Sequence, residues 1–192
     1  MNLSRTLLLA SSSPRRKELL ASLGLTFEVK VKDVHEDFPE HLKRAEVAEY
    51  LASHKADQYM EDLCDEALIA ADTIVCLGER ILNKPADYAE AFEMLQALSG
   101  KRHEVVTGVC VLTRAQKTVF HDMTSVYFKT LSEAEIDFYI THYKPFDKAG
   151  AYGIQEWIGM IGIERIEGSY FNVVGLPVQK LYIQLQALGI IG

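Results

Sequence analysis

The distribution of apolar and polar residues along the first half of the chain predicts both strands and helices. Residues 7–10 and 67–77 are apolar runs, as in strands that are buried on both faces. Residues 26–31 alternate between apolar and polar side chains, which predicts a half-buried strand. Residues 45–63 and 88–98 repeat apolar side chains every three or four positions, which predicts two amphipathic helices.

The second half of the chain continues this mixture. Residues 105–113 and 118–129 predict an antiparallel pair of strands, and Ser132 with Glu135 forms a capping box for a helix that reaches about Thr141. Residues 158–166 predict a further strand, and residues 178–188, after Pro177, a closing helix. The order predicts a mixed α/β fold with a central mixed sheet flanked by helices.

The first helix begins with a conflict of charges. Ser13 suits an N-cap and Pro14 the first helical position, but Arg15, Arg16 and Lys17 then fill a first turn where the helix dipole favours acidic side chains. A bound anion such as phosphate would resolve this conflict. The alternative is a solvated basic turn on the surface. The buried strand and serine-rich turn that come before the helix favour the anion site.

Two charged residues lie in otherwise apolar patterns. Lys55 falls in the middle of the apolar stripe of the helix predicted at residues 45–63, and Asp72 lies at the centre of the strand predicted at residues 67–77. Either residue could serve a bound ligand. The structural alternatives are a lysine stem that reaches past apolar neighbours into water, and an aspartate that caps local backbone at a strand end or bulge. The residues alone leave both alternatives open.

Composition limits the function classes. The chain of 192 residues is 48% hydrophobic, enough for the core of one domain or of two closely packed lobes. A net charge of −7 without a basic stripe argues against nucleic acid as a partner. No apolar run is long enough for a membrane span, no secretory signal pattern is present, and the three cysteines lack paired metal-ligand spacing. We therefore expect a cytoplasmic protein with no membrane partner.

Several short motifs then occur in a characteristic order. They are SSSPRR at residues 11–16, ADT at 71–73, KP at 84–85, LSG at 98–100, TG at 107–108, KAGAYGIQ at 148–155 and GSYFNVVGLP at 168–177. This set resembles the Maf family of nucleoside triphosphate pyrophosphatases over nearly the whole chain. The resemblance implies a single Maf-like domain over residues 1–192, with an ITPase-like fold of two closely packed lobes and a cleft between them.

The resemblance also implies a reaction and residue roles. The family hydrolyses the α–β phosphoanhydride bond of a nucleoside triphosphate to give the monophosphate and pyrophosphate. This chain is most similar to the subgroup acting on dTTP and UTP, and modified pyrimidine nucleotides are further candidate substrates. The implied roles are general base for Asp72, base selection for Arg15, Thr73 and Gln155, and phosphate binding for Ser11, Ser13, Arg16, Lys55, Lys84 and Lys148.

A divalent cation and a dimer follow from the same resemblance. Glu36 and Asp72 would hold the cation, which would be Mg²⁺, with Mn²⁺ or Co²⁺ as alternatives. Glu36 lies in the acidic loop at residues 33–37, where His35 is inserted relative to the family pattern. The implied partners are a small-molecule nucleotide and a second copy of the chain. The alternative function is a nucleotide-binding regulator of cell division and septum formation.

Overall fold

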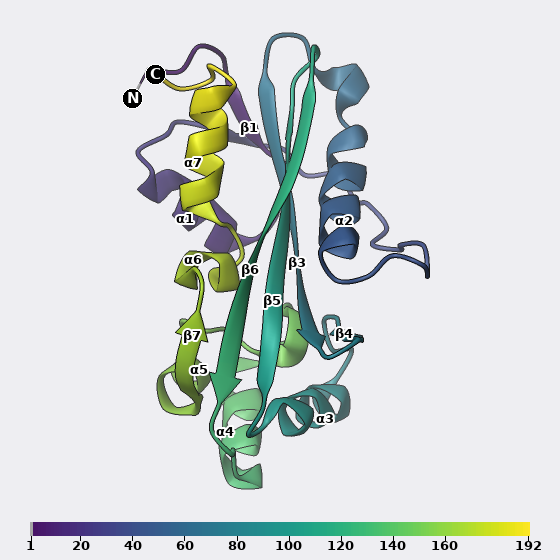
Figure 1. Ribbon diagram of the computed structural model, residues 1–192, viewed down its shortest axis with the longest axis vertical. Coiled ribbons are helices and arrows are strands. Elements are labelled where there is room, and N and C mark those ends of the chain that lie inside the picture. Colours follow the sequence, from purple (N-terminus) through teal and green to yellow (C-terminus); the bar gives the residue numbers. More distant parts are fainter. Residues whose placement is uncertain (1) are drawn as a thin grey trace. The chain divides into compact units, whose positions relative to one another are not determined.

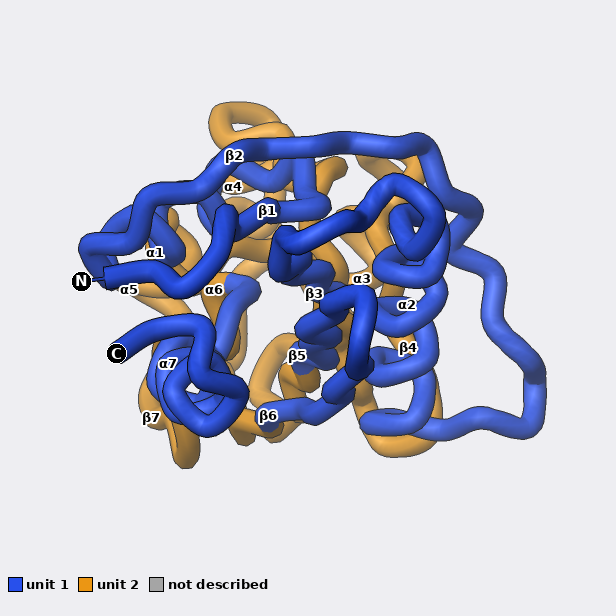
Figure 2. Tube along the Cα trace, turned by 90° about the horizontal axis from the view of Figure 1, so that it is seen from above, with its two compact units in different colours: residues 1–72, 107–122, 175–192 blue, residues 73–106, 123–174 orange. Residues whose placement is uncertain are grey.

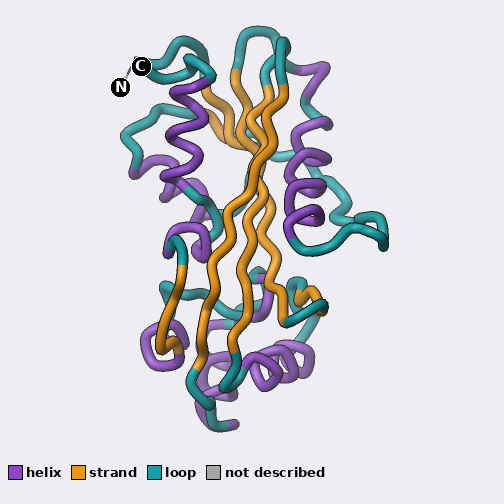
Figure 3. The backbone as a smooth tube through the Cα atoms, viewed as in Figure 1, coloured by secondary structure: helices purple, strands orange, loops and turns teal. Residues whose placement is uncertain are grey.

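The computed structural model describes residues 2–192, and the chain divides into two compact units. Unit 1 comprises Met1–Asp72, Thr107–Asp122 and Gly175–Gly192, and unit 2 comprises Thr73–Val106 and Met123–Val174 (Figure 2). Figure 3 marks the helices and strands that make up both units. The units are described separately below, and the single Maf-like domain over residues 1–192 stays a prediction.

Unit 1 is built on a sheet in which β1 is central to β2 and β3, and it pairs with both in parallel. Its elements are β1 (Leu7–Leu9), α1 (Pro14–Ser22), β2 (Glu28–Val29), α2 (Ala45–Asp57), a 3₁₀ helix (Met60–Asp62), the first part of β3 (Ala67–Leu77), the last part of β5 (Arg102–Leu112), the first part of β6 (Lys117–Phe128) and α7 (Val178–Ala187). Near the two chain ends, Leu3 and Ile191 form an antiparallel bridge.

The core of unit 1 lies on both faces of this sheet. Alternation along β1 directs Leu7 and Leu9 into a cluster with α1 and α7, and directs Leu8 into a cluster with α2. The helices therefore cover opposite sides of the strands (Figure 1). The α2 backbone approaches β5 at Gly108, where an added Cβ atom would lie 2.1 Å from the carbonyl oxygen of Ala48. Glycine is required there for close packing, not for its backbone angles.

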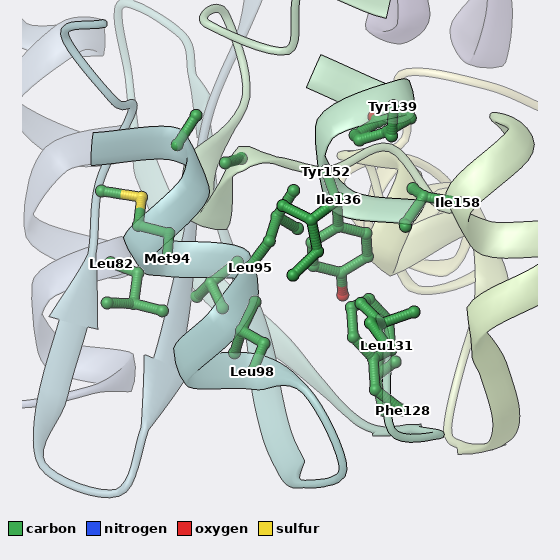
Figure 4. Packing of buried hydrophobic residues seen from close by; sticks show 14 of the residues in the cluster. Leu82, Met94, Leu95, Leu98, Phe128, Leu131, Ile136, Tyr139, Tyr152 and Ile158 are labelled. Atoms are coloured by element: carbon green, nitrogen blue, oxygen red, sulfur yellow. The ribbon is translucent and has the colours of Figure 1, made fainter. Parts of the chain in front are cut away.

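Unit 2 surrounds a second core. Its elements are the last part of β3, β4 (Arg80–Leu82), α3 (Tyr88–Leu98), the first part of β5, the last part of β6, α4 (Glu133–Tyr143), a 3₁₀ helix (Ala149–Ala151), α5 (Trp157–Gly162), β7 (Ile163–Glu167) and α6 (Tyr170–Val174). β4 pairs antiparallel with β3, and β7 pairs antiparallel with β6. Apolar side chains from α3, α4 and α5 meet Phe128 and Tyr152 in the centre of this unit (Figure 4).

The predicted mixed α/β class, with a mixed sheet and flanking helices, is confirmed. The bounds predicted for β3 and α3 are also those of the structure. The helix predicted at residues 45–63 ends earlier, at Asp57, and a 3₁₀ helix follows it. The strand predicted at residues 26–31 is reduced to the two exposed residues of β2.

The strand predicted at residues 158–166 is wrong in its first part. Residues Trp157–Gly162 form α5, and only Ile163–Glu167 form a strand. The helical turn buries Ile158 completely and leaves Met160 73% exposed, so its apolar residues do not share one environment. A short apolar run is compatible with either structure, and its periodicity could not decide between them.

Candidate active site

The turn after β1 shapes the start of α1 in unit 1. The Ser13 hydroxyl caps the helix by accepting the backbone N–H of Arg16 at 3.4 Å, and Pro14 occupies the first helical position. The buried Ser11 hydroxyl accepts the backbone N–H of Ser13 at 3.2 Å. Both predicted serines thus line a helix N-terminus, a place where backbone dipoles attract anions.

The Arg16 side chain forms a hydrogen bond with a residue 159 positions away in the sequence. Its Nε atom donates to the carbonyl oxygen of Gly175 at 2.8 Å. Gly175 has a φ of 128°, in the left-handed region that favours glycine. The pKa of Arg16 is lowered overall, mainly because the guanidinium is buried. The carboxylates of Asp72 and Glu36 oppose this shift, and the charge of Arg15 adds to it. The guanidinium therefore lies within the electrostatic field of both predicted metal-binding carboxylates.

Lys55 joins the two carboxylates directly. Its ammonium contacts the carboxylate of Asp72 and lies 2.8 Å from a carboxylate oxygen of Glu36. The side chains of Lys55 and Asp72 are 16% and 10% exposed, and that of Glu36 is 42% exposed. The ammonium of Lys55 therefore pairs with a buried carboxylate instead of reaching into water. Asp72 lies inside β3, so it neither ends the strand nor serves only as a local cap.

The predicted site residues fall into two groups. Unit 1 contains Ser11, Ser13, Arg15, Arg16, Glu36, Lys55 and Asp72, and unit 2 contains Thr73, Lys84, Lys148 and Gln155. Within unit 1, elements far apart in the sequence bring the charges of Arg16 and Lys55 each into electrostatic interaction with Glu36 and Asp72. Arg15 is half-buried on α1 beside this cluster.

In unit 2, the predicted residues differ in exposure. Thr73 is half-buried on β3, and Lys84 is exposed just after β4. Lys148 is buried and pairs with Asp147 at 2.7 Å and with Glu156 at 3.1 Å. Gln155 is exposed near the end of the glycine-containing loop, residues 148–156. The segment before Lys84 is fixed to this loop because the Gly150 N–H donates to the carbonyl of Asn83 at 3.1 Å.

The unit 1 cluster can accommodate a divalent cation when a substrate supplies further ligands. Glu36 and Asp72 both contact one ammonium, so their oxygens already converge on one centre of positive charge. No group of three or more His, Cys, Asp or Glu side chains that could hold a metal occurs within residues 2–192. Mg²⁺ commonly uses one or two carboxylates together with waters and substrate phosphates, and the two carboxylates match that pattern.

Comparison with known proteins accounts for this combination of motifs and fold. A family model described as Maf-like protein matches residues 6–188. The chain belongs to the Maf family. A Flavobacterium psychrophilum protein named dTTP/UTP pyrophosphatase is 51% identical, over 93% of this chain and 92% of its own. A Phocaeicola vulgatus protein of the same name is 52% identical over 95% of each chain.

Among solved structures, the Staphylococcus aureus Ham1 protein shares the fold of this Maf chain. Its TM-score is 0.54 at 16% identity, with 95% of this chain and 99% of that chain covered. Such a likeness describes the fold alone. No helix within residues 2–192 is long and apolar enough to cross a membrane.

Sequence reasoning missed three residues of this region. Gly175 was part of a recognised motif, but nothing in the motif indicated that its carbonyl binds Arg16. Glu156 directly follows Gln155, and Tyr139 lies on α4; both contact the glycine-containing loop. Only the position of Glu156 beside a predicted specificity residue could have drawn attention to it.

Proposed function

We propose that this Maf chain hydrolyses dTTP and UTP to the nucleoside monophosphate and pyrophosphate. The observation that carries the proposal is the cluster in which Lys55 contacts Asp72 and Glu36 beside the half-buried Arg16. It combines the cations that a triphosphate needs with a buried carboxylate. The full-length relatives named dTTP/UTP pyrophosphatase support the substrate assignment.

The reaction is an attack of water on the α-phosphorus. The water oxygen forms a bond to phosphorus, the bond from phosphorus to the bridging oxygen of the β-phosphate breaks, and pyrophosphate leaves with the bond electrons. Asp72 orients the water and accepts its proton. Phosphoryl transfer depends mainly on positioning and on charge neutralisation, which are the roles of Arg16 and Lys55 here.

Lys55 links substrate binding to the freeing of Asp72. Without substrate, its ammonium is shared between Asp72 and Glu36. A triphosphate brings oxygens that compete for the same ammonium, and Lys55 then moves its hydrogen bonds towards the phosphates. The carboxylate of Asp72 becomes available to the attacking water. The remaining phosphate ligands in this proposal are Ser11, Ser13, Lys84 and Lys148.

Base selection belongs to side chains that can form hydrogen bonds with a pyrimidine edge. Thr73 follows Asp72 directly, and the exposed Gln155 carries both an amide donor and an acceptor. Together with Arg15, these residues would distinguish uracil and thymine from other bases. A base without the matching donors and acceptors would leave these polar side chains unpaired, and it would therefore be rejected.

A divalent cation is part of the proposal. Glu36 and Asp72 would hold Mg²⁺, or Mn²⁺ or Co²⁺ in its place, and the ion would neutralise charge on the phosphate oxygens. We further propose that residues 1–192 act as one Maf-like domain, since the family model spans both units. A homodimer and a cytoplasmic location stay predictions, which sedimentation and cell fractionation would test.

Pyrophosphate release from a nucleotide panel tests the function. Purified protein would be assayed with dTTP, UTP, CTP, ATP, GTP and 7-methyl-GTP, with and without added Mg²⁺, Mn²⁺ or Co²⁺. Metal-dependent release with dTTP and UTP as the best substrates is the expected result. Tight nucleotide binding without release would contradict it and would favour the alternative of a nucleotide-binding regulator of cell division.

A further inference from the structure

A buried tyrosine contacts the glycine-containing loop in unit 2. Tyr139, on α4, is fully buried, and its hydroxyl donates to the carboxylate of Glu156 (Figure 4 shows its place in the core). The same hydroxyl accepts the backbone N–H of Gly153 at 3.0 Å. Burial and the hydrogen bond to Glu156 both raise the pKa of Tyr139, so the hydroxyl keeps its proton as a donor at neutral pH.

Glu156 extends this contact to a predicted phosphate ligand. Its second carboxylate oxygen lies 3.1 Å from the Nζ atom of Lys148, whose ammonium also contacts Asp147. Lys148 is buried, and a buried charge is costly unless it is paired, so these carboxylates compensate the burial of its ammonium. One carboxylate therefore links α4 to Lys148 at the start of the loop, while the Tyr139 hydroxyl holds the backbone just before Gln155.

The loop itself has a strained backbone that needs such support. Gly150 and the buried Ala151 have φ values of 68° and 60°, and this left-handed conformation is strained for alanine although glycine adopts it readily. At Gly153, an added Cβ atom would lie 2.9 Å from Cδ of Glu156 and 3.0 Å from Nε2 of Gln155. Strained conformations persist where surrounding contacts fix them. Here the Tyr139 hydroxyl binds the backbone at Gly153, and the Glu156 carboxylate binds Lys148, so both contacts hold residues of this loop.

We propose that Tyr139 and Glu156 are positioning residues for loop 148–156: Glu156 holds the Lys148 ammonium, and Tyr139 fixes the backbone that presents Gln155. This inference rests on the proposed function for the identity of the substrate. The two residues support different functions of the loop, triphosphate binding and base recognition. Loss of the Glu156 charge weakens the grip on the triphosphate, whereas loss of the Tyr139 hydroxyl weakens discrimination between bases.

Two conservative variants separate these roles. Glu156→Gln keeps an acceptor for Tyr139 but removes the charge opposite Lys148, so KM for UTP should rise about tenfold with kcat and base ranking retained. Tyr139→Phe keeps the ring in the core but removes the hydroxyl. The ratio of kcat/KM for UTP to that for CTP should fall about tenfold, the change expected when a polar contact to a charged group is lost.

The matched control is Tyr88→Phe. Tyr88 also donates to a carboxylate on α4, that of Asp137 at 2.6 Å, but this pair is exposed and touches no loop residue named above. The control should keep wild-type kinetics. If Tyr139→Phe and Glu156→Gln only lower the midpoint of thermal unfolding, as a purely structural contact would, with KM, kcat and base ranking unchanged, the inference is overturned.

Hydrogen exchange gives a readout that needs no activity. In the nucleotide-free protein, the amide of Gly153 should exchange about tenfold faster in Tyr139→Phe than in the wild type or in Tyr88→Phe, because its acceptor is lost. Unchanged exchange would overturn the inference even in an active enzyme. A wild-type protein that releases no pyrophosphate, but whose Gly153 amide responds in this way, would contradict the proposed function and leave the positioning role supported.

Discussion

Lys55 holds Glu36 at 2.8 Å, although one residue lies on α2 and the other on an exposed loop. The same ammonium contacts Asp72, so one cation connects a loop, a helix and a strand. These charged groups are paired with one another without ligand, and in the proposed function Lys55 exchanges its carboxylate partners for phosphate oxygens. The first two predictions follow from this exchange.

Asp72→Asn should lower kcat for UTP by about 10²–10⁴-fold, because the amide cannot accept the proton of the attacking water. Nucleotide affinity should be retained, since Arg16 and Lys55 are still present to bind the phosphates. Pyrophosphate release and equilibrium binding of UTP measure the two effects. Turnover near the wild-type rate would remove Asp72 from the chemistry.

Lys55→Ala should both weaken substrate binding and destabilise the fold. The buried carboxylate of Asp72 would lose an ionic partner, at a cost of about 1–3 kcal/mol in the free energy of unfolding. Lys117→Ala provides the control, since Lys117 pairs with Asp57 at 2.7 Å on the surface, where such pairs contribute about 0–1 kcal/mol. Urea unfolding and KM for UTP would distinguish the two variants. Equal effects would contradict the assignment of Lys55.

Gln155→Ala should reduce the preference for UTP over CTP more than it reduces affinity for the triphosphate. The exposed amide of Gln155 is free of any role in the apolar core, so stability should be unchanged. Competition assays with inorganic triphosphate separate phosphate affinity from base recognition. An unchanged ranking of the nucleotide panel would refute the role of Gln155.

Gly108→Ala should displace α2, which carries Lys55. The new Cβ atom would lie 2.1 Å from the carbonyl oxygen of Ala48, and backbone atoms cannot yield as a flexible side chain can. We expect a loss of about 1–3 kcal/mol in stability, as for overpacked cores, together with reduced turnover. Gly192→Ala, where nothing lies within 4 Å, is the control. Thermal unfolding and the UTP assay would report both effects.

Stability should fall as the pH decreases from about 6.5 to 4, because of His103. Burial lowers the pKa of this side chain to about 4, below its ordinary value of 6.5. Between these two pH values the unfolded chain binds a proton that the folded chain does not. The free energy of unfolding therefore falls by about 1.4 kcal/mol for each unit by which the pH decreases. His103→Gln should flatten this part of the profile of unfolding free energy against pH. An unchanged slope would show that other groups cause it.

Local patterns made much of the architecture predictable. The apolar run of β3 and the helical spacing of α3 gave their bounds, because both elements bury the residues that define the pattern. Ser13 was recognisable as a cap because capping is a contact with the next turn of the same helix. Lys55 and Asp72 stood out as charges in apolar patterns, and the structure pairs them.

Contacts between distant segments were not predictable in this way. Arg16 binds the carbonyl of Gly175, 159 positions away, and a backbone acceptor leaves no trace in the identity of a residue. The Tyr139 contact with Glu156 likewise depends on how α4 packs against the loop. α5 was missed because its apolar residues fit a strand as well as a helical turn. The roles implied by resemblance for the site residues stay predictions until the variants are measured.

The composition of unit 1 from three separate stretches has a consequence for biosynthesis. Leu3 bridges to Ile191 and Arg16 to Gly175, so both partners of the first segment are translated long after that segment. Domains generally fold as units during synthesis. The nascent chain therefore carries Arg16 without its anchor until Gly175 has been translated, so unit 1 completes its fold only after its third stretch has left the ribosome.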